Sequence, residues 1–232
     1  LSGERLSTGI ESLDRLVGGG YWPGASTLIA GPSGVGKTLV GLHFIAAGAA
    51  RNEPCLIASL QENPAQLDRV AKGFSWDLGE VRMLYRSPVD LYLDEWIHNL
   101  LDEVERSGIK RVLIDSLSDL QHAEPDEVRF REYIYSLVQR FSRAGVSLVM
   151  TTEVPDLFTT TSLSEFGISH LADNVLLLQY VRDGSKLRRA LTVLKARATM
   201  IEPEVSEFTI DQRGIVIAGT IDSRPGVRRD LA

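Results

Sequence analysis

The chain has 232 residues, of which 44% are hydrophobic, and this composition suits one large soluble α/β domain or two small ones. No apolar run approaches the roughly 20 residues of a membrane helix, and no charged stretch followed by an apolar one opens the chain, so we expect no membrane span and no signal peptide. The single cysteine cannot form an internal disulfide, so a reducing, cytoplasmic compartment is the default expectation. A net charge of −6 argues against general nucleic-acid binding, because a basic face supplies most of the affinity for nucleic acids.

Apolar segments of two kinds alternate along the chain up to residue 153. Buried strands are predicted at 26–30, 54–60, 110–116 and 146–151. Helices are predicted at about 37–51, from Asn63-Pro64 onward, at 90–107, and between Pro125 and Gly145. Strands that alternate with helices imply right-handed crossovers and a mostly parallel central sheet flanked by helices on both faces.

The pattern changes after residue 153. A polar stretch at 159–164 precedes β-rich segments near 174–181, 187–195, 205–210 and 215–217. These segments predict a C-terminal antiparallel extension of the same sheet. We therefore expect residues 1–221 to form a single α/β domain, and residues 222–232 to be a polar tail or a linker to a domain absent from this sequence.

The segment Gly31–Thr38 fits the phosphate-binding pattern G-x-x-x-x-G-K-[ST]. Its glycines let successive backbone N–H groups turn toward phosphate oxygens, and the following helix points its positive end at the same anion. Lys37 is expected to reach the β- and γ-phosphates, and the Thr38 hydroxyl to bind Mg²⁺. The predicted ligand is therefore ATP with Mg²⁺, and the expected ATP-binding residues are Pro32, Ser33, Gly34, Val35, Gly36, Lys37, Thr38 and Leu39.

Two acidic residues follow predicted strands and are candidates for chemistry. Asp115 ends the apolar strand 111–115, where a carboxylate can hold magnesium through water opposite Thr38. Many buried strands end in Asp as a cap, so the pairing with the phosphate loop carries this interpretation. Glu62, after the second strand, is the candidate to orient the attacking water and to lie beside the metal. The alternative for Glu62 is a solvated residue in the turn before the next helix.

For several further residues the sequence offers a structural role, a functional role or both. Ser116 and Ser118 are either hydrogen-bond partners of the site or turn residues, and Thr151 to Glu153 end a strand where a γ-phosphate sensor can lie. Trp96 and His43 are expected to face the core. The single cysteine, Cys55, lies in an apolar run, which predicts a small buried residue and not a reactive thiol.

The ordered set of motifs resembles the RecA superfamily and, within it, KaiC and KaiC-like ATPases. The resemblance spans about residues 5–217 and rests on the segments 7–14, 18–20, 31–38, 61–64, 73–78, 114–118, 172–175, 178–180 and 194–197. It implies a RecA-like P-loop NTPase fold, a hexameric ring of identical subunits, and ATP held between neighbouring subunits.

The same resemblance implies roles for three basic residues at the ATP site between subunits. It implies that Lys195 and Arg197 reach the γ-phosphate of a neighbour's ATP and that Arg189 lies near the same interface. Lys195 and Arg197 alternate on a predicted strand and so share a face, where cations offset charge that develops in the transition state. The alternative is a solvated basic strand.

Two departures from the family pattern matter. The family usually has paired glutamates after the second strand, whereas this chain has Gln61-Glu62, and Gln61 cannot act as a base, so slow hydrolysis is expected. One KaiC domain phosphorylates adjacent Ser and Thr residues, and the matching positions here are Ser169 and His170. Ser169 is thus a candidate for autophosphorylation, or both residues are ordinary interface polar groups.

Three functions stay open at this point. The first is a KaiC-like ring ATPase with optional serine autokinase activity. The second is a nucleotide-dependent assembly or signalling module for protein partners, with negligible turnover. The third is a RecA/RadA-like DNA-dependent recombinase. The acidic charge opposes the third function, as does segment 154–170, which contains no lysine or arginine.

Overall fold

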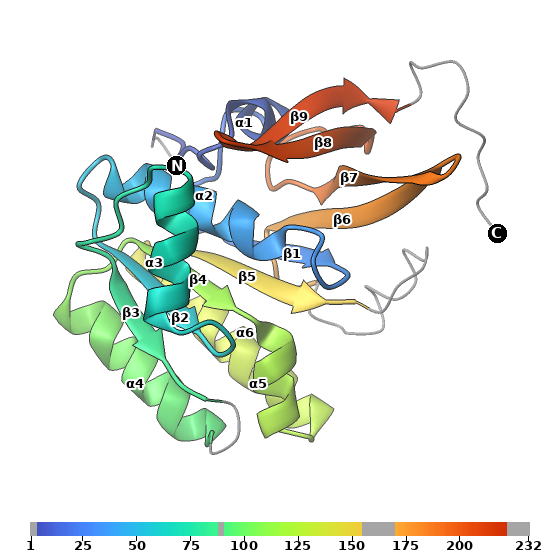
Figure 1. The fold of residues 1–232 in the computed structure, drawn as a ribbon. Helices are drawn as coiled ribbons and strands as arrows, with labels where there is room; N and C mark the ends of the chain where they lie inside the picture. The colour runs from blue at the N-terminus through green and yellow to red at the C-terminus, as the bar shows by residue number, and fades with distance from the viewer. Residues whose placement is uncertain (1–3, 88–90, 155–169, 222–232) are drawn as a thin grey trace.

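The computed structural model describes residues 4–87, 91–154 and 170–221, in which one sheet is flanked by helices on both faces (Figure 1). The strands of this described part are β1 (Ser26–Gly31), β2 (Cys55–Ser59), β3 (Arg82–Tyr85), β4 (Arg111–Asp115), β5 (Ser147–Glu153), β6 (Asn174–Asp183), β7 (Lys186–Lys195), β8 (Val205–Asp211) and β9 (Gly214–Thr220). The helices are α1 (Glu11–Leu16), α2 (Lys37–Ala49), α3 (Pro64–Gly73), α4 (Leu93–Arg106), α5 (Leu117–Ala123) and α6 (Glu127–Ala144). Within the described ranges, none of the helices is both long enough and apolar enough to cross a membrane.

The strands lie in the order β3-β2-β4-β5-β1-β6-β7-β8-β9. Pairs from β3 to β6 are parallel, and pairs from β6 to β9 are antiparallel. Because parallel strands share a direction, the loops that follow β1, β2, β4 and β5 all lie at one edge of the sheet. This is the α/β architecture that the sequence predicts, including the antiparallel C-terminal extension.

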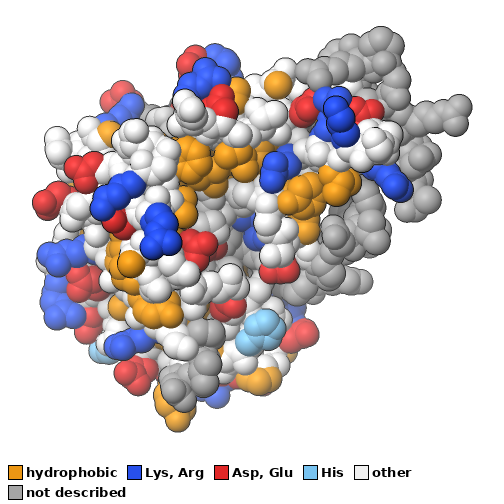
Figure 2. Space-filling model, in the orientation of Figure 1, with side chains coloured by type: hydrophobic (Ala, Val, Ile, Leu, Met, Phe, Trp, Pro, Cys, Tyr) orange, Lys and Arg blue, Asp and Glu red, His pale blue; other side chains and the backbone are white. Residues whose placement is uncertain are grey.

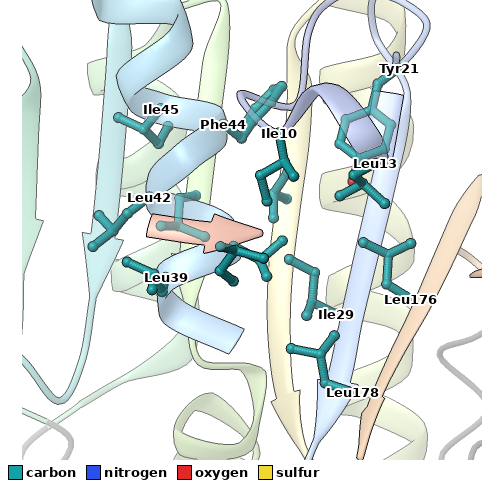
Figure 3. Packing of buried hydrophobic residues seen from close by; sticks show 14 of the residues in the cluster. Ile10, Leu13, Tyr21, Ile29, Leu39, Leu42, Phe44, Ile45, Leu176 and Leu178 are labelled. Atoms are coloured by element: carbon teal, nitrogen blue, oxygen red, sulfur yellow. The ribbon is translucent and has the colours of Figure 1, made fainter. Parts of the chain in front are cut away.

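The sheet has a hydrophobic core on each face, because successive strand residues point to opposite sides. One core packs against α1, α2 and α3, and its strand residues include Ile29, Ile57, Leu113, Val149, Leu176 and Leu178. Figure 3 shows Ile29, Leu176 and Leu178 of this core together with residues of α1 and α2. The other packs against α4, α5 and α6, and its strand residues include Leu28, Leu56, Val112, Ile114, Leu148 and Met150. Burial on both faces explains why these strands are continuous apolar runs without polar alternation.

Helix α2, which continues from the phosphate loop, is enclosed on most of its sides. Against the sheet, Gly41 allows a close approach, since a Cβ at this position would lie 2.5 Å from Leu113 Cδ1. On another side, Nε2 of His43 accepts a 2.9 Å hydrogen bond from the backbone N–H of Ile215 in β9. Burial lowers the pKa of His43 to about 4, so the imidazole is neutral and can accept this bond. The second turn of α2 is therefore packed against β4 on one side and hydrogen-bonded to β9 on another.

The buried side chain of Arg111 connects β4 to three other segments of the chain. It donates to the Glu53 carboxylate at 2.6 Å from Nε, and to the carbonyl oxygens of Ser7 and Phe44 at 2.8 and 3.0 Å. The Phe44 ring also lies 4.6 Å from the guanidinium carbon. A buried charge requires partners of this kind, so Arg111 serves the fold.

Some predicted element boundaries are corrected by the structure. Helix α6 begins at Glu127, two residues after Pro125, because the Asp126 side chain accepts hydrogen bonds from the first helical N–H groups and acts as the N-cap. Gly145, with a φ of 68°, ends the helix as predicted. The elements α1, β3 and α5, which are four to seven residues long, were not predicted from the sequence. Trp96, His43 and Cys55 are buried, as predicted.

Candidate nucleotide-binding site

The predicted phosphate loop joins β1 to α2 at the edge where the parallel strands end. Gly34 and Gly36 adopt φ values of 73° and 118°, which side chains disfavour. Val35 is fully buried and anchors the loop, whereas Ser33 and Gly34 are exposed. The first helical hydrogen bond runs from the Val40 N–H to the Gly36 carbonyl, so the preceding N–H groups lack helical acceptors. This arrangement suits an anion.

Leu39 and Pro32 belong to the same loop and contribute differently from its polar residues. The Leu39 side chain is buried in the core, so a ligand can meet only its backbone. Pro32 offers its carbonyl oxygen, to which Lys37 Nζ donates a 2.7 Å hydrogen bond. Burial lowers the pKa of Lys37, while Glu153 and Asp115 oppose this effect. A phosphate beside the ammonium would favour its charged form further.

Asp115 connects the phosphate loop to β5. The Thr38 hydroxyl donates a 2.8 Å hydrogen bond to Oδ2 of Asp115, and the Thr151 hydroxyl donates to Oδ1. Burial raises the pKa of Asp115, and the two hydroxyl donors and Lys37 partly offset this increase. The predicted pairing of Thr38 with Asp115 is thus present in the geometry. Thr151, one of the residues from 151 to 153 that the sequence suggested as candidate phosphate sensors, contacts the Asp115 carboxylate.

Glu62 lies at the same edge, after β2. Its backbone N–H donates a 3.2 Å hydrogen bond to the Ser59 hydroxyl, and the next residue, Asn63, is the N-cap of α3. Burial raises the pKa of the Glu62 carboxyl, with a further contribution from Asp115. Its Oε2 atom is buried and has no hydrogen-bond partner among the residues that the structure describes. Glu62 as a whole is half-buried.

These residues fit a magnesium ion. Magnesium in phosphate sites usually takes one or two side-chain oxygens and fills its other positions with water and phosphate oxygens. Thr38 and Asp115 provide two such oxygens, and the unpartnered Glu62 oxygen lies on the neighbouring loop. Among residues 4–87, 91–154 and 170–221 no group of three or more His, Cys, Asp or Glu could hold a metal by itself.

A family model described as "ATPase: KaiC" matches residues 6–221. The chain belongs to the KaiC ATPase family. This membership agrees with the RecA-like P-loop fold and with nucleotide binding at the loop.

Curated KaiC relatives support the same assignment. The chain is 31% identical over 229 residues to the circadian clock protein KaiC3 of Synechocystis, covering 96% of this chain and 45% of that protein. It is 33% identical over 237 aligned positions to the KaiC of Parathermosynechococcus lividus, covering 100% and 43%, and 28% identical over 222 residues to the KaiC of Picosynechococcus, covering 93% and 43%. The chain spans less than half the length of these relatives.

The residues that follow Asp115 in this KaiC-family chain form a network of side-chain hydrogen bonds. Ser116 Oγ donates to Oδ2 of Asp119 at 2.5 Å, and Gln61 Nε2 donates to Oδ1 of Asp119 at 3.0 Å. Ser118 shares a 3.2 Å hydrogen bond with Thr152 and accepts from the N–H of residue 153 at 2.8 Å. The serines are thus hydrogen-bond partners of the site and not only turn residues. Asp119 was not predicted from the sequence, where its only signal was a carboxylate four residues after Asp115.

Lys195 and Arg197, which the sequence resemblance predicts to reach a neighbour's ATP, lie far from the phosphate loop of their own chain. Lys195 pairs with Val175, which in turn pairs with Leu28 near the start of β1. The phosphate loop follows the other end of β1. The two cations are therefore at the opposite edge of the sheet, where β7 ends (Figure 1).

The structure corrects the prediction that Lys195 and Arg197 alternate on one strand. β7 ends at Lys195, because the Arg197 N–H donates to the Asn174 side chain at 3.1 Å and not to a neighbouring strand. Both side chains nevertheless turn toward one segment: Lys195 Nζ donates to the Ala172 carbonyl at 2.7 Å, and Arg197 donates to Asp173 at 2.6 Å.

Arg189 is on the other half of β7 and is not brought together with Lys195 and Arg197. It pairs with Tyr180, and its guanidinium carbon lies 5.7 Å from the centre of the Tyr180 ring. The Tyr180 hydroxyl lies 3.5 Å from where a Cβ on Gly34 would be. Arg189 is thus at the same edge as its own phosphate loop. Ser169, the candidate phosphorylation site, lies outside the described residues.

Proposed function

We propose that this KaiC-family chain binds Mg-ATP at Gly31–Thr38 and hydrolyses it slowly at the interfaces of a hexameric ring. The observation that carries the proposal is the Thr38–Asp115 hydrogen bond at the end of a phosphate loop that opens α2. Magnesium, when bound by Thr38 and Asp115 with Glu62 nearby, would neutralise charge on the phosphate oxygens. The loop N–H groups and Lys37 would hold the β- and γ-phosphates.

Glu62 is proposed to orient the attacking water and to accept its proton. Its buried, unpartnered oxygen is available for a water, and its raised pKa makes the carboxylate a better proton acceptor than an ordinary glutamate. Its side chain lies on the loop between β2 and α3, at the edge shared with the phosphate loop. These features support a base at this position.

Lys195 and Arg197 are proposed to complete the site of a neighbouring subunit. They lie at the sheet edge opposite their own phosphate loop, so a contribution to ATP hydrolysis by either cation requires a second copy of the chain. Arg189, next to Tyr180 and Gly34, is proposed to contact the nucleotide at its own chain's loop. Residues 1–221 would then form the ATPase unit, and 222–232 a tail or linker.

A second candidate function is a nucleotide-dependent assembly or signalling module with negligible turnover. The residue type at position 61 favours it, because the Gln61 amide offers no second base beside Glu62. Autophosphorylation of Ser169 is proposed as an additional activity that is compatible with either function. On the face seen in Figure 2, Lys and Arg side chains are interspersed with Asp and Glu, which does not favour a DNA-binding role for that face. The relatives' names refer to a circadian clock; for this chain the proposal is the ATPase step.

One set of measurements tests the proposal. Steady-state ATP turnover should be measurable, and Lys37→Ala and Glu62→Gln should each reduce it by at least roughly 100-fold. The mass of the assembly, measured with ATP, with ADP and without nucleotide, should correspond to six chains when ATP is present. Phosphopeptide mapping of the same samples tests Ser169. Turnover that both substitutions leave unchanged would overturn the ATPase proposal, and hexamers without turnover would favour the assembly module.

A further inference from the structure

We infer that Gln61 is a positioning residue: through its hydrogen bond to Asp119 it fixes the segment that carries Glu62 relative to Asp115. The inference rests on the proposed function. Asp119 is buried at the start of α5, and its two carboxylate oxygens each accept one hydrogen bond. Oδ1 accepts from Gln61 Nε2 at 3.0 Å, and Oδ2 accepts from Ser116 Oγ at 2.5 Å.

The amide of Gln61 suits this contact in a way that a carboxylate does not. An ionised carboxylate is an acceptor only, so buried Asp119 needs donors, and Gln61 is a neutral donor. A glutamate at position 61 would place a second acceptor about 3 Å from Asp119, with no proton between them. Gln61 therefore not only lacks a carboxylate that could act as a base but also donates a hydrogen bond that a glutamate could not donate.

The strands β2 and β4 pair in parallel up to Ser59 and Asp115, and the Gln61–Asp119 contact extends this connection to the loop that carries Glu62. The Leu60 N–H donates a 3.0 Å hydrogen bond to the Asp115 carbonyl, which joins the end of β2 to the end of β4. Gln61 adds a second connection through Asp119 and Ser116, which immediately follows Asp115. Glu62 is the next residue after Gln61. Within the part of the chain that the structure describes, loss of the second connection would leave the Leu60–Asp115 bond as the hydrogen bond between this loop and β4 beyond the strand ladder.

Exchanging the amide of Gln61 and the carboxylate of Asp119 tests whether Gln61 acts by positioning the segment that carries Glu62. In Gln61→Glu, two acceptors face one another and the contact is lost. In the double variant Gln61→Glu/Asp119→Asn, the new amide nitrogen at position 119 can donate to the glutamate while the amide oxygen accepts from Ser116, so every bond is restored with donor and acceptor reversed. Gln61→Met removes the donor without adding charge. Asn52→Asp makes the same change of amide to carboxylate at an exposed turn before β2, at the opposite sheet edge.

The experiment measures kcat, the dissociation constant for ATP, and the unfolding temperature for each full-chain variant. We expect Gln61→Glu to lower kcat roughly tenfold and Gln61→Met about threefold, with the ATP dissociation constant changed less than about twofold. The double variant should recover kcat to within about threefold of the unsubstituted chain, and Asn52→Asp should not change it. If Gln61→Glu fails to fold, Gln61→Met and the double variant supply the comparison.

The outcomes separate this inference from the proposed function. Turnover that Gln61→Glu leaves unchanged or raises would overturn the positioning role and keep the ATPase. A double variant no more active than Gln61→Glu, or parallel losses of kcat and ATP affinity, would also overturn it. An unsubstituted chain without turnover would remove the proposed function, and this inference with it.

Discussion

The hydroxyl of Thr38 donates a 2.8 Å hydrogen bond to the Asp115 carboxylate, although the two residues are 77 positions apart. One closes the phosphate loop and the other ends β4, so the fold alone brings the two proposed magnesium-holding groups together. The Thr151 hydroxyl, from β5 between them, donates to the other oxygen of Asp115. A cation here would enter a set of oxygens that is already assembled.

Asp115→Asn should leave the stability of the nucleotide-free chain intact and abolish its stabilisation by Mg-ATP. Burial disfavours the ionised carboxylate, so the neutral amide should leave the nucleotide-free chain at least as stable as before. We expect the increase in unfolding temperature on adding Mg-ATP to disappear, and turnover to fall by roughly 100-fold or more. Thermal unfolding with and without Mg-ATP measures both effects. Asp68→Asn, in an exposed pair with Lys72, is the control and should keep the full response.

His43 should make the fold less stable at low pH. Its pKa is about 4 in the folded chain and near 6.5 when unfolded, so the unfolded state binds the proton more readily. The contribution of His43 is present above pH 6.5 and is lost as the pH falls toward 4, a change of about 3 kcal/mol. Urea unfolding at pH 7.5 and 4.5 measures it.

His43→Gln should remove that part of the pH dependence, because the glutamine oxygen can accept from the Ile215 N–H without titrating. His98→Gln is the matched control, since His98 is exposed and pairs only with Asp102 in the described structure. The idea fails if both substitutions alter the pH dependence equally.

The tight packing of α2 on the sheet predicts opposite effects for two Gly→Ala changes. At Gly41 the new Cβ would lie 2.5 Å from the buried Leu113 side chain, so Gly41→Ala should lower the free energy of unfolding by about 1–3 kcal/mol. At Gly73, in α3, a Cβ would meet nothing within 4 Å, and Gly73→Ala should raise it by about 0.5–1 kcal/mol. Denaturant titration compares the two. Equal effects would contradict the packing described for α2.

Mixing experiments should distinguish cations that act on their own chain from those that act on a neighbour. Lys37→Ala and Lys195→Ala/Arg197→Ala chains should each be inactive. Mixed one to one, they should regain about a quarter of the unsubstituted activity, because that share of interfaces joins an intact loop to intact cations.

Lys37→Ala mixed with Arg189→Ala should show no such recovery, because Arg189 lies beside its own phosphate loop. Recovery in the second mixture as strong as in the first would contradict the placement of Arg189.

Local patterns predicted most of this structure, and long-range contacts explain what was missed. The phosphate loop and the buried strands are read from neighbouring residues, and so is the N-cap at Asn63. The Gln61–Asp119 bond joins residues 58 positions apart, and no spacing rule indicates it. Strand β3 is short and partly exposed, so it lacks a clear apolar pattern. Arg197 leaves the strand because a side chain of β6 captures its N–H, which is again a tertiary effect.

The opposite placement of the phosphate loop and of Lys195 with Arg197 gives each chain two unlike ends. Such ends match head to tail, as in a heterologous contact, so one chain's cations can serve only the next chain's loop. An open row would always leave one loop and one pair of cations unused, and closing the row into a ring removes both. In the proposed assembly, turnover per chain would therefore fall on dilution, as rings open and whole sites are lost.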